Sequence, residues 1–194
     1  MRQHPKVRTP RRLSLLVAFA LGASSCRAPR APQPLPEEAR TAGTTWLVIS
    51  CGLGERNQLE AILVRYKAEL EPFFLEALDK GPDPKLAAGV QQAASTRFEQ
   101  RQEALKTGKG LGLSDADLQA AREVTREQYL AQEHEDFILR YRSQAVAALG
   151  IVDGAKGRAA LEALARDQNS PLNGSAQEAL RHLQEPGGNP PVKR

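Results

Sequence analysis

Apolar residues recur at helical spacing over most of the chain, from about residue 44 to 185. A spacing of i, i+3, i+4 and i+7 places side chains on one face and predicts an amphipathic α-helix. The first clear stripe consists of Leu59, Ile62, Leu63 and Tyr66. The second consists of Phe73, Phe74, Ala77 and Leu78. Pro72, just before it, is expected in the first turn of that helix.

Glycine, proline and capping residues indicate where the helices begin and end. Gly81-Pro82 is expected to stop the second helix, and Pro84 to start a polar helix that reaches about residue 105. After a glycine-rich loop, Ser114 is expected to be an N-cap, because acidic residues that suit the helix dipole follow it. One long helix is expected from there to Leu149, ended by Gly150.

Two short helices complete the pattern, one around Leu161 and Leu164 and the other from about Ala176 to Leu183. Aromatic residues make up only 5% of the chain, while alanine and leucine are abundant. This composition favours helices that pack closely through small side chains over a β-sandwich. The sequence therefore predicts an all-α domain over residues 44–185.

Short segments of this domain repeat one another. Residues 143–150 (Ser-Gln-Ala-Val-Ala-Ala-Leu-Gly) align with residues 174–181 (Gly-Ser-Ala-Gln-Glu-Ala-Leu-Arg), and Leu-Glu-Ala-Leu occurs at 161–164 and at 75–78. These motifs resemble HEAT-like repeats of the short bacterial type, best over residues 137–184. The resemblance implies a short α-solenoid, a stack of antiparallel helices that presents a surface to a partner. Residues 84–132 depart from the pattern, and an irregular helical bundle is the alternative there.

The first 25 residues are typical of an export signal. Residues 1–12 are basic without an acid, and residues 13–23 form an apolar run of about eleven residues, too short to span a bilayer. The sequence Ala23-Ser24-Ser25-Cys26 then resembles the lipobox of bacterial lipoproteins, although leucine is usual where Ala23 stands. The resemblance implies that residues 1–25 are a lipoprotein signal peptide and that Cys26 carries the lipid.

Other interpretations of the leader are an ordinary secretory signal cut near Ala23 or Ser25, and an uncleaved anchor. Arg11-Arg12 also resembles a twin-arginine signal faintly.

Residues 26–43 are expected to form a proline-rich tether, because their four prolines favour extended polyproline II. Residues 186–194 are expected to be a disordered tail. The residue after the cysteine is Arg27. In Gram-negative lipoproteins this resembles the default for sorting to the outer membrane, which implies that the protein would face the periplasm in such a host.

The net charge of +4 at first indicates a nucleic-acid partner. Five of the 27 basic residues lie in the leader, however, so the remaining chain has 22 basic and 23 acidic residues. The sequence therefore predicts no nucleic-acid partner. The expected partners are a membrane, through lipid on Cys26, and an unidentified protein.

Candidate chemistry is sparse. His134-Glu135-Asp136 is the most site-like cluster, but adjacent helical residues point about 100° apart, and a solvated polar face is expected. His182 is also expected to be exposed. The loop at 108–112 has phosphate-loop composition without the Walker spacing, and Cys51, in an apolar run, is expected to be a small buried residue.

The sequence thus predicts no catalytic residue, cofactor or metal site. The expected function is a lipid-anchored, non-enzymatic interaction module of the cell envelope. The alternative is a secreted or anchored all-α enzyme, or a cofactor-handling protein of HEAT-like fold.

Overall fold

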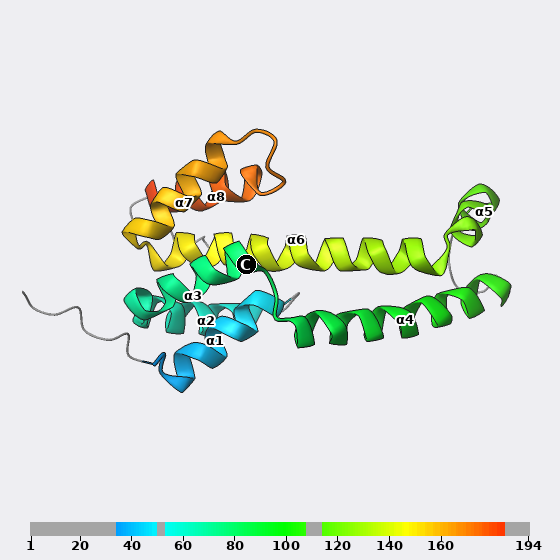
Figure 1. The fold of residues 1–194 in the computed structure, drawn as a ribbon, viewed down its shortest axis with the longest axis horizontal. Coiled ribbons are helices and arrows are strands. Elements are labelled where there is room, and N and C mark those ends of the chain that lie inside the picture. Colours follow the sequence, from blue (N-terminus) through cyan, green and yellow to red (C-terminus); the bar gives the residue numbers. More distant parts are fainter. Residues whose placement is uncertain (1–33, 50–52, 108–113, 185–194) are drawn as a thin grey trace, which may run out of the picture. The chain divides into compact units, whose positions relative to one another are not determined.

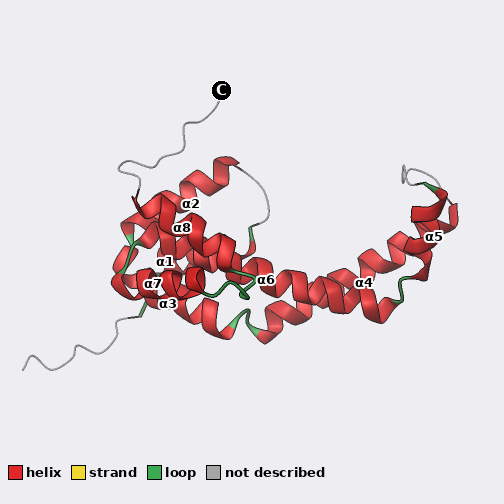
Figure 2. Cartoon of the chain, turned by 90° about the horizontal axis from the view of Figure 1, so that it is seen from above, coloured by secondary structure: helices red, strands yellow, loops and turns green. Residues whose placement is uncertain are grey.

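The computed structural model describes residues 34–49, 53–107 and 114–184, and this part of the chain is entirely helical, as expected (Figures 1 and 2). The helices are α1 (Glu37–Val48), α2 (Leu53–Arg65), α3 (Lys67–Lys80), α4 (Pro84–Thr107), α5 (Asp115–Glu123), α6 (Arg126–Val152), α7 (Ala155–Arg166) and α8 (Asn173–Gln184). The leader with Cys26, the rest of the tether up to residue 33, Cys51, the loop at 108–112 and the C-terminal tail lie outside the described residues.

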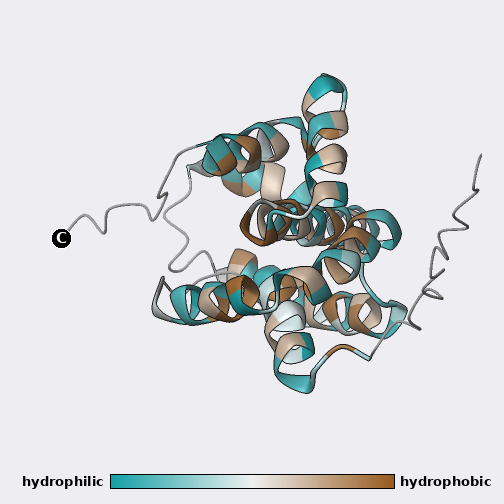
Figure 3. Cartoon of the chain, turned by 90° about the vertical axis from the view of Figure 1, so that its left-hand side faces the viewer, coloured by the Kyte–Doolittle hydropathy of each residue, from teal (hydrophilic) through white to brown (hydrophobic). Residues whose placement is uncertain are grey.

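The long helix α6 is the centre of the packing. Among the described helices it contacts α1, α2, α3, α4, α7 and α8. Its C-terminal half carries the expected apolar stripe into the core, where its buried residues are Phe137, Tyr141, Ala145, Val146, Ala148, Leu149 and Val152. Figure 3 shows hydrophobic and hydrophilic positions side by side on the helices that face the viewer, as expected for amphipathic helices that bury one face.

The contacts of α6 bear on the expected repeat architecture. In a solenoid each repeat contacts only its neighbours, whereas α6 contacts helices from both ends of the described chain. The C-terminal half of α6 packs with α7 and α8, which also pack on each other, in the region where the repeat resemblance is best. The all-α stack of helices is confirmed, while its HEAT-like character stays a prediction.

The helical domain begins earlier than the expected boundary at residue 44. Helix α1 starts at Glu37, so residues 37–43 belong to the domain and not to the tether. Ala39, Ala42 and Gly43 are buried, and a Cβ on Gly43 would lie 2.8 Å from the Phe73 ring. Because these residues are small, no stripe of large apolar side chains marks the start of this helix in the sequence.

The expected long helix from Ser114 to Leu149 is two helices. Thr125 starts α6 with a capping box, in which its side chain accepts from the Gln128 N–H and the Gln128 side chain accepts from the Thr125 N–H. This exchange satisfies amide groups that a helix start leaves unpaired. The predicted C-terminal end of this helix, at Leu149, was also wrong. Helix α6 continues through Gly150 to Val152, and its C-cap is Asp153, with a φ of 48°.

The other helix boundaries are largely as expected. Ser114 caps α5 by accepting from the Asp117 N–H, and Gly81, with a φ of 76°, ends α3. The expectation that Pro72 lies in the first turn of its helix was wrong, since α3 begins at Lys67 and Pro72 lies in its second turn. At that position proline costs α3 one backbone hydrogen bond.

Helices α4 and α6 form an antiparallel pair that is joined by α5 (Figure 1). Arginines make most of the polar contacts here: Arg97 pairs with Glu133 at 2.6 Å, and the Arg101 guanidinium lies 5.5 Å from the Tyr129 ring. Of the described helices, α5 contacts only α4. This end of the domain therefore has much less apolar burial than the core around α3 and α6.

A cleft between helices α2 and α8

The structure places the candidate residues of the sequence apart from one another. Glu135 and Asp136 are exposed, as expected for a polar face, and Asp136 accepts a hydrogen bond from Gln132 at 2.8 Å. His134, however, is half-buried, and its Nδ1 is buried without a hydrogen-bond partner. The expectation of a fully solvated cluster was therefore wrong for His134. His182 is exposed, as expected.

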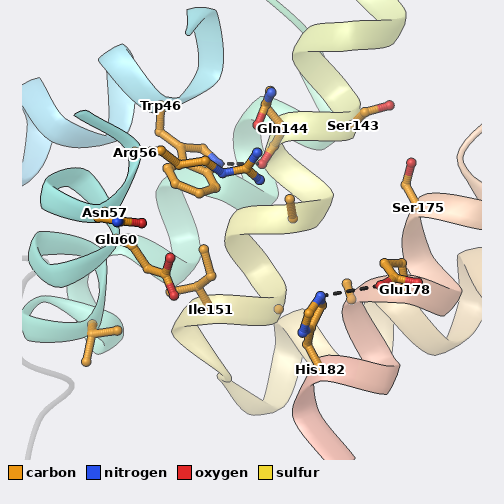
Figure 4. A pocket seen from close by; sticks show the side chains of 14 residues that line it. Trp46, Arg56, Asn57, Glu60, Ser143, Gln144, Ile151, Ser175, Glu178 and His182 are labelled. Atoms are coloured by element: carbon orange, nitrogen blue, oxygen red, sulfur yellow. Dashed lines mark hydrogen bonds and ion pairs between the residues drawn. The ribbon is translucent and has the colours of Figure 1, made fainter. Parts of the chain in front are cut away.

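A feature that the sequence did not reveal is a cleft of about 570 Å³. Helices α2 and α8 form its walls and α6 forms its floor, with Trp46 of α1 beside it (Figure 4). Its lining residues are Trp46, Arg56, Asn57, Glu60, Val64, Ser143, Gln144, Ala147, Gly150, Ile151, Ser175, Glu178, Ala179 and His182. A volume of this size is in the range that holds a small molecule or a few side chains of a peptide.

Trp46 holds one end of the cleft in place. Its ring is only 1% exposed, and its Nε1 donates a hydrogen bond to the Gln144 carbonyl oxygen at 2.9 Å. The Arg56 guanidinium lies 5.0 Å from the centre of the ring, in cation–π contact (Figure 4). This stack joins α1, α2 and α6, so the charge of Arg56 is held at the cleft wall.

The α8 wall carries Ser175, Glu178 and His182 at i, i+3 and i+7, on one face of the helix. The Glu178 carboxylate lies 3.4 Å from His182 Nε2 and 2.7 Å from the Arg181 guanidinium. These are exposed pairs, and pairs of this kind contribute little stability. Their effect is to present acceptors and donors at the mouth of the cleft.

Small residues explain why the floor is open. Ala147 and Gly150 lie on α6 between the two walls. Gly150 also allows α8 to come close, because a Cβ on Gly150 would lie 3.0 Å from the Ala179 Cβ. Longer side chains at these positions would fill the cleft from below.

The lining of the cleft combines charged, polar and apolar groups. Its polar groups are of mixed kind, with a guanidinium and a carboxylate on α2 facing a carboxylate and an imidazole on α8, over a floor that also includes Ser143 and Gln144. In the described part of the chain, no hydrogen bond joins His182 to Ser143 or Ser175, the pairing that an activated nucleophile needs. Nor do His, Cys, Asp and Glu residues gather in threes to hold a metal within the described ranges.

The cleft depends on the meeting of three distant segments, which sequence spacing does not show. Along the sequence, only the single tryptophan, Trp46, and His182 could have drawn attention to the residues of this cleft.

Within residues 34–49, 53–107 and 114–184, no helix combines the length and the apolar character needed to cross a bilayer. No protein-family model matches the chain, and neither a curated protein nor a solved structure shows significant similarity to it.

Proposed function

We propose that this chain is a lipid-anchored protein of the cell envelope, and that its helical domain binds a protein partner without catalysing a reaction. The observation that carries the binding role is the cleft between α2 and α8, with its open floor and fixed polar walls. The resemblance of residues 137–184 to HEAT-like repeats supports the same role, because stacked helices commonly present a surface to a partner.

The anchor rests on Cys26 and on the segments around it. An apolar run of signal length precedes the cysteine, and four prolines follow within ten residues. At about 3.1 Å per residue, residues 27–36 would hold the helical domain roughly 30 Å from the lipid. Such a spacer suits a domain that must reach a partner from a membrane surface.

Mass spectrometry of the N-terminal peptide tests the anchor directly. The wild-type peptide is expected to begin at Cys26 and to carry acyl mass, and a Cys26→Ser variant is expected to lose that mass. A Cys51→Ser variant is the control, since it makes the same substitution outside the lipobox-like segment. An unmodified wild-type peptide that begins before or after Cys26 would show that the anchor proposal is wrong.

An obstruction of the cleft floor tests the binding role. Ala147→Arg would fill the floor, while Ala131→Arg adds the same side chain at an exposed position of α6. Proteins that copurify with the wild type from membranes are quantified for both variants by mass spectrometry. We expect one partner to be lost with Ala147→Arg and kept with Ala131→Arg. Equal capture by both, or stoichiometric iron or zinc in the purified chain, would contradict the proposal.

A further inference from the structure

A second hollow, with a volume of about 710 Å³, has only α6 in common with the cleft and shares no lining residue with it. Helix α6 forms its floor, and α3, α7 and the segment before α8 form its walls. Most of the lining is apolar, and its large hydrophobic residues are Leu75, Leu78, Ile138, Leu139, Leu164 and Leu172. We call this hollow the leucine groove.

The leucine groove is open to an incoming side chain. Leu139, on its floor, is 38% exposed, one of three large hydrophobic residues exposed to that degree in the described part of the chain. The floor residues run from Glu135 to Arg142 at i, i+3, i+4 and i+7. They cover two helical turns, or about 10 Å. This length matches a short apolar stripe on another helix.

Charges at the rim of the leucine groove select the partner. Asp79 of α3 and Glu135 of α6 line it and are exposed, and neither carboxylate forms an ion pair with a described residue. Arg142 also lines the groove, but its Nη2 donates to the Asp79 backbone oxygen at 3.2 Å. Residues 34–184 contain 18 basic and 22 acidic residues. The charge at the rim and the charge of residues 34–184 therefore both favour a cationic partner.

We propose that the leucine groove binds a basic amphipathic helix of a partner protein. An apolar stripe of about two turns would lie against Leu75, Leu139 and Leu164. Lysine or arginine residues beside that stripe would pair with Asp79 and Glu135. This inference rests on the proposed role as an interaction module and names the chemistry of its partner.

Two synthetic helices of about four turns test the charge preference. Both carry the same leucine stripe, and the flanking positions are lysine in one and glutamate in the other. Their binding to the full chain in neutral phospholipid nanodiscs is measured by fluorescence anisotropy, with empty nanodiscs as the blank. We expect the lysine peptide to bind about tenfold more tightly than the glutamate peptide, equivalent to about 1.4 kcal/mol.

Variants then locate the binding to the leucine groove. Leu139→Arg is expected to weaken binding of the lysine peptide at least about tenfold. Val48→Arg is the matched control, because Val48 is 42% exposed and lines neither hollow. Asp79→Asn with Glu135→Gln is expected to remove most of the preference for lysine. Glu99→Gln with Glu127→Gln makes the same change of charge elsewhere and is expected to keep it.

Three results would overturn this inference. They are equal affinity for the two peptides, unchanged binding by Leu139→Arg, and binding of a fluorescent fatty acid at Leu139 with no binding of either peptide. The last result would assign the groove to a lipid. Because the measurement uses purified chain and does not involve the cleft floor, it can fail while the anchor and cleft experiments succeed, and the reverse.

Discussion

The carboxylate of Glu71, in the middle of α3, accepts a hydrogen bond from the backbone N–H of Gly157 at 2.6 Å. Gly157 is the third residue of α7, so a side chain from one helix caps the N-terminus of another. Gly154, the N-cap of α7, has no side chain of its own to do this, and its missing Cβ leaves the space that the Glu71 carboxylate occupies. The first turn of α7 therefore depends on a side chain of α3.

Removal of this cap should destabilise the domain. Glu71→Ala is expected to lower the free energy of unfolding by about 1–2 kcal/mol, because it leaves the Gly157 N–H unpaired. Glu71→Gln keeps an acceptor and is expected to cost about half as much. Urea unfolding followed by circular dichroism measures both, with Glu99→Ala at an exposed position as the control. A loss no larger than that of Glu99→Ala would contradict the capping role.

The space above Gly154 gives a second prediction. Gly154→Ala is expected to destabilise the domain by about 2 kcal/mol, because the new Cβ would overlap the Glu71 carboxylate. In a Glu71→Ala background the overlap is gone, and the cost should fall to the roughly 1 kcal/mol that alanine costs at an N-cap. Gly89→Ala, where nothing lies within 4 Å, should instead stabilise α4 by about 0.5–1 kcal/mol. A double-mutant cycle without coupling would rule out the steric explanation.

The α4–α6 pair should open more readily at its α5 end than in the core. Leu105 and Ala121 are buried there, but neither belongs to the main hydrophobic cluster. Amide groups in residues 97–107 and 115–123 should therefore exchange with deuterium orders of magnitude faster than those around Ala145 and Leu149. Hydrogen exchange followed by mass spectrometry provides the measurement. Equal protection along the whole length of α6 and α4 would contradict this expectation.

Alkaline pH should weaken the fold through Tyr141. Burial, and secondarily the negative charge of Asp83, raise the pKa of this phenol above its usual value of 10.0. The folded state therefore holds the proton more tightly, so this contribution to stability is fully present below pH 10 and is lost as the pH rises through the raised pKa. Tyr141→Phe should lose less stability than the wild type between about pH 9 and pH 11. Parallel losses in the two urea-unfolding series would show that Tyr141 is not responsible.

The sequence predicted a helix boundary correctly where the residue that marks the boundary in the sequence is also the residue that produces it. Ser114 caps α5 and Gly81 ends α3 because each needs only its own side chain or backbone conformation. Thr125 and Gln128 were also a visible capping signal, but the continuous polar pattern around them favoured one long helix. The start of α1 was missed because alanine and glycine pack there without a large apolar stripe.

The cleft and the leucine groove could not be predicted in this way. Each is formed by side chains from several helices, and the relative placement of α2, α6 and α8 follows from close contacts such as that of Gly150 with Ala179. The tertiary cap of Glu71 on Gly157 has the same origin, since the two residues are 86 positions apart in the sequence. The lipid on Cys26 stays a prediction from the sequence, which lies outside the described residues.

The position of Trp46 makes the chain its own fluorescent probe. It is the single tryptophan of the sequence, so all indole emission comes from one end of the cleft. The arginine above the ring and the carbonyl that accepts from its Nε1 set its electronic surroundings. A molecule that enters between α2 and α8 would change those surroundings, and candidate ligands can be screened in solution without any label.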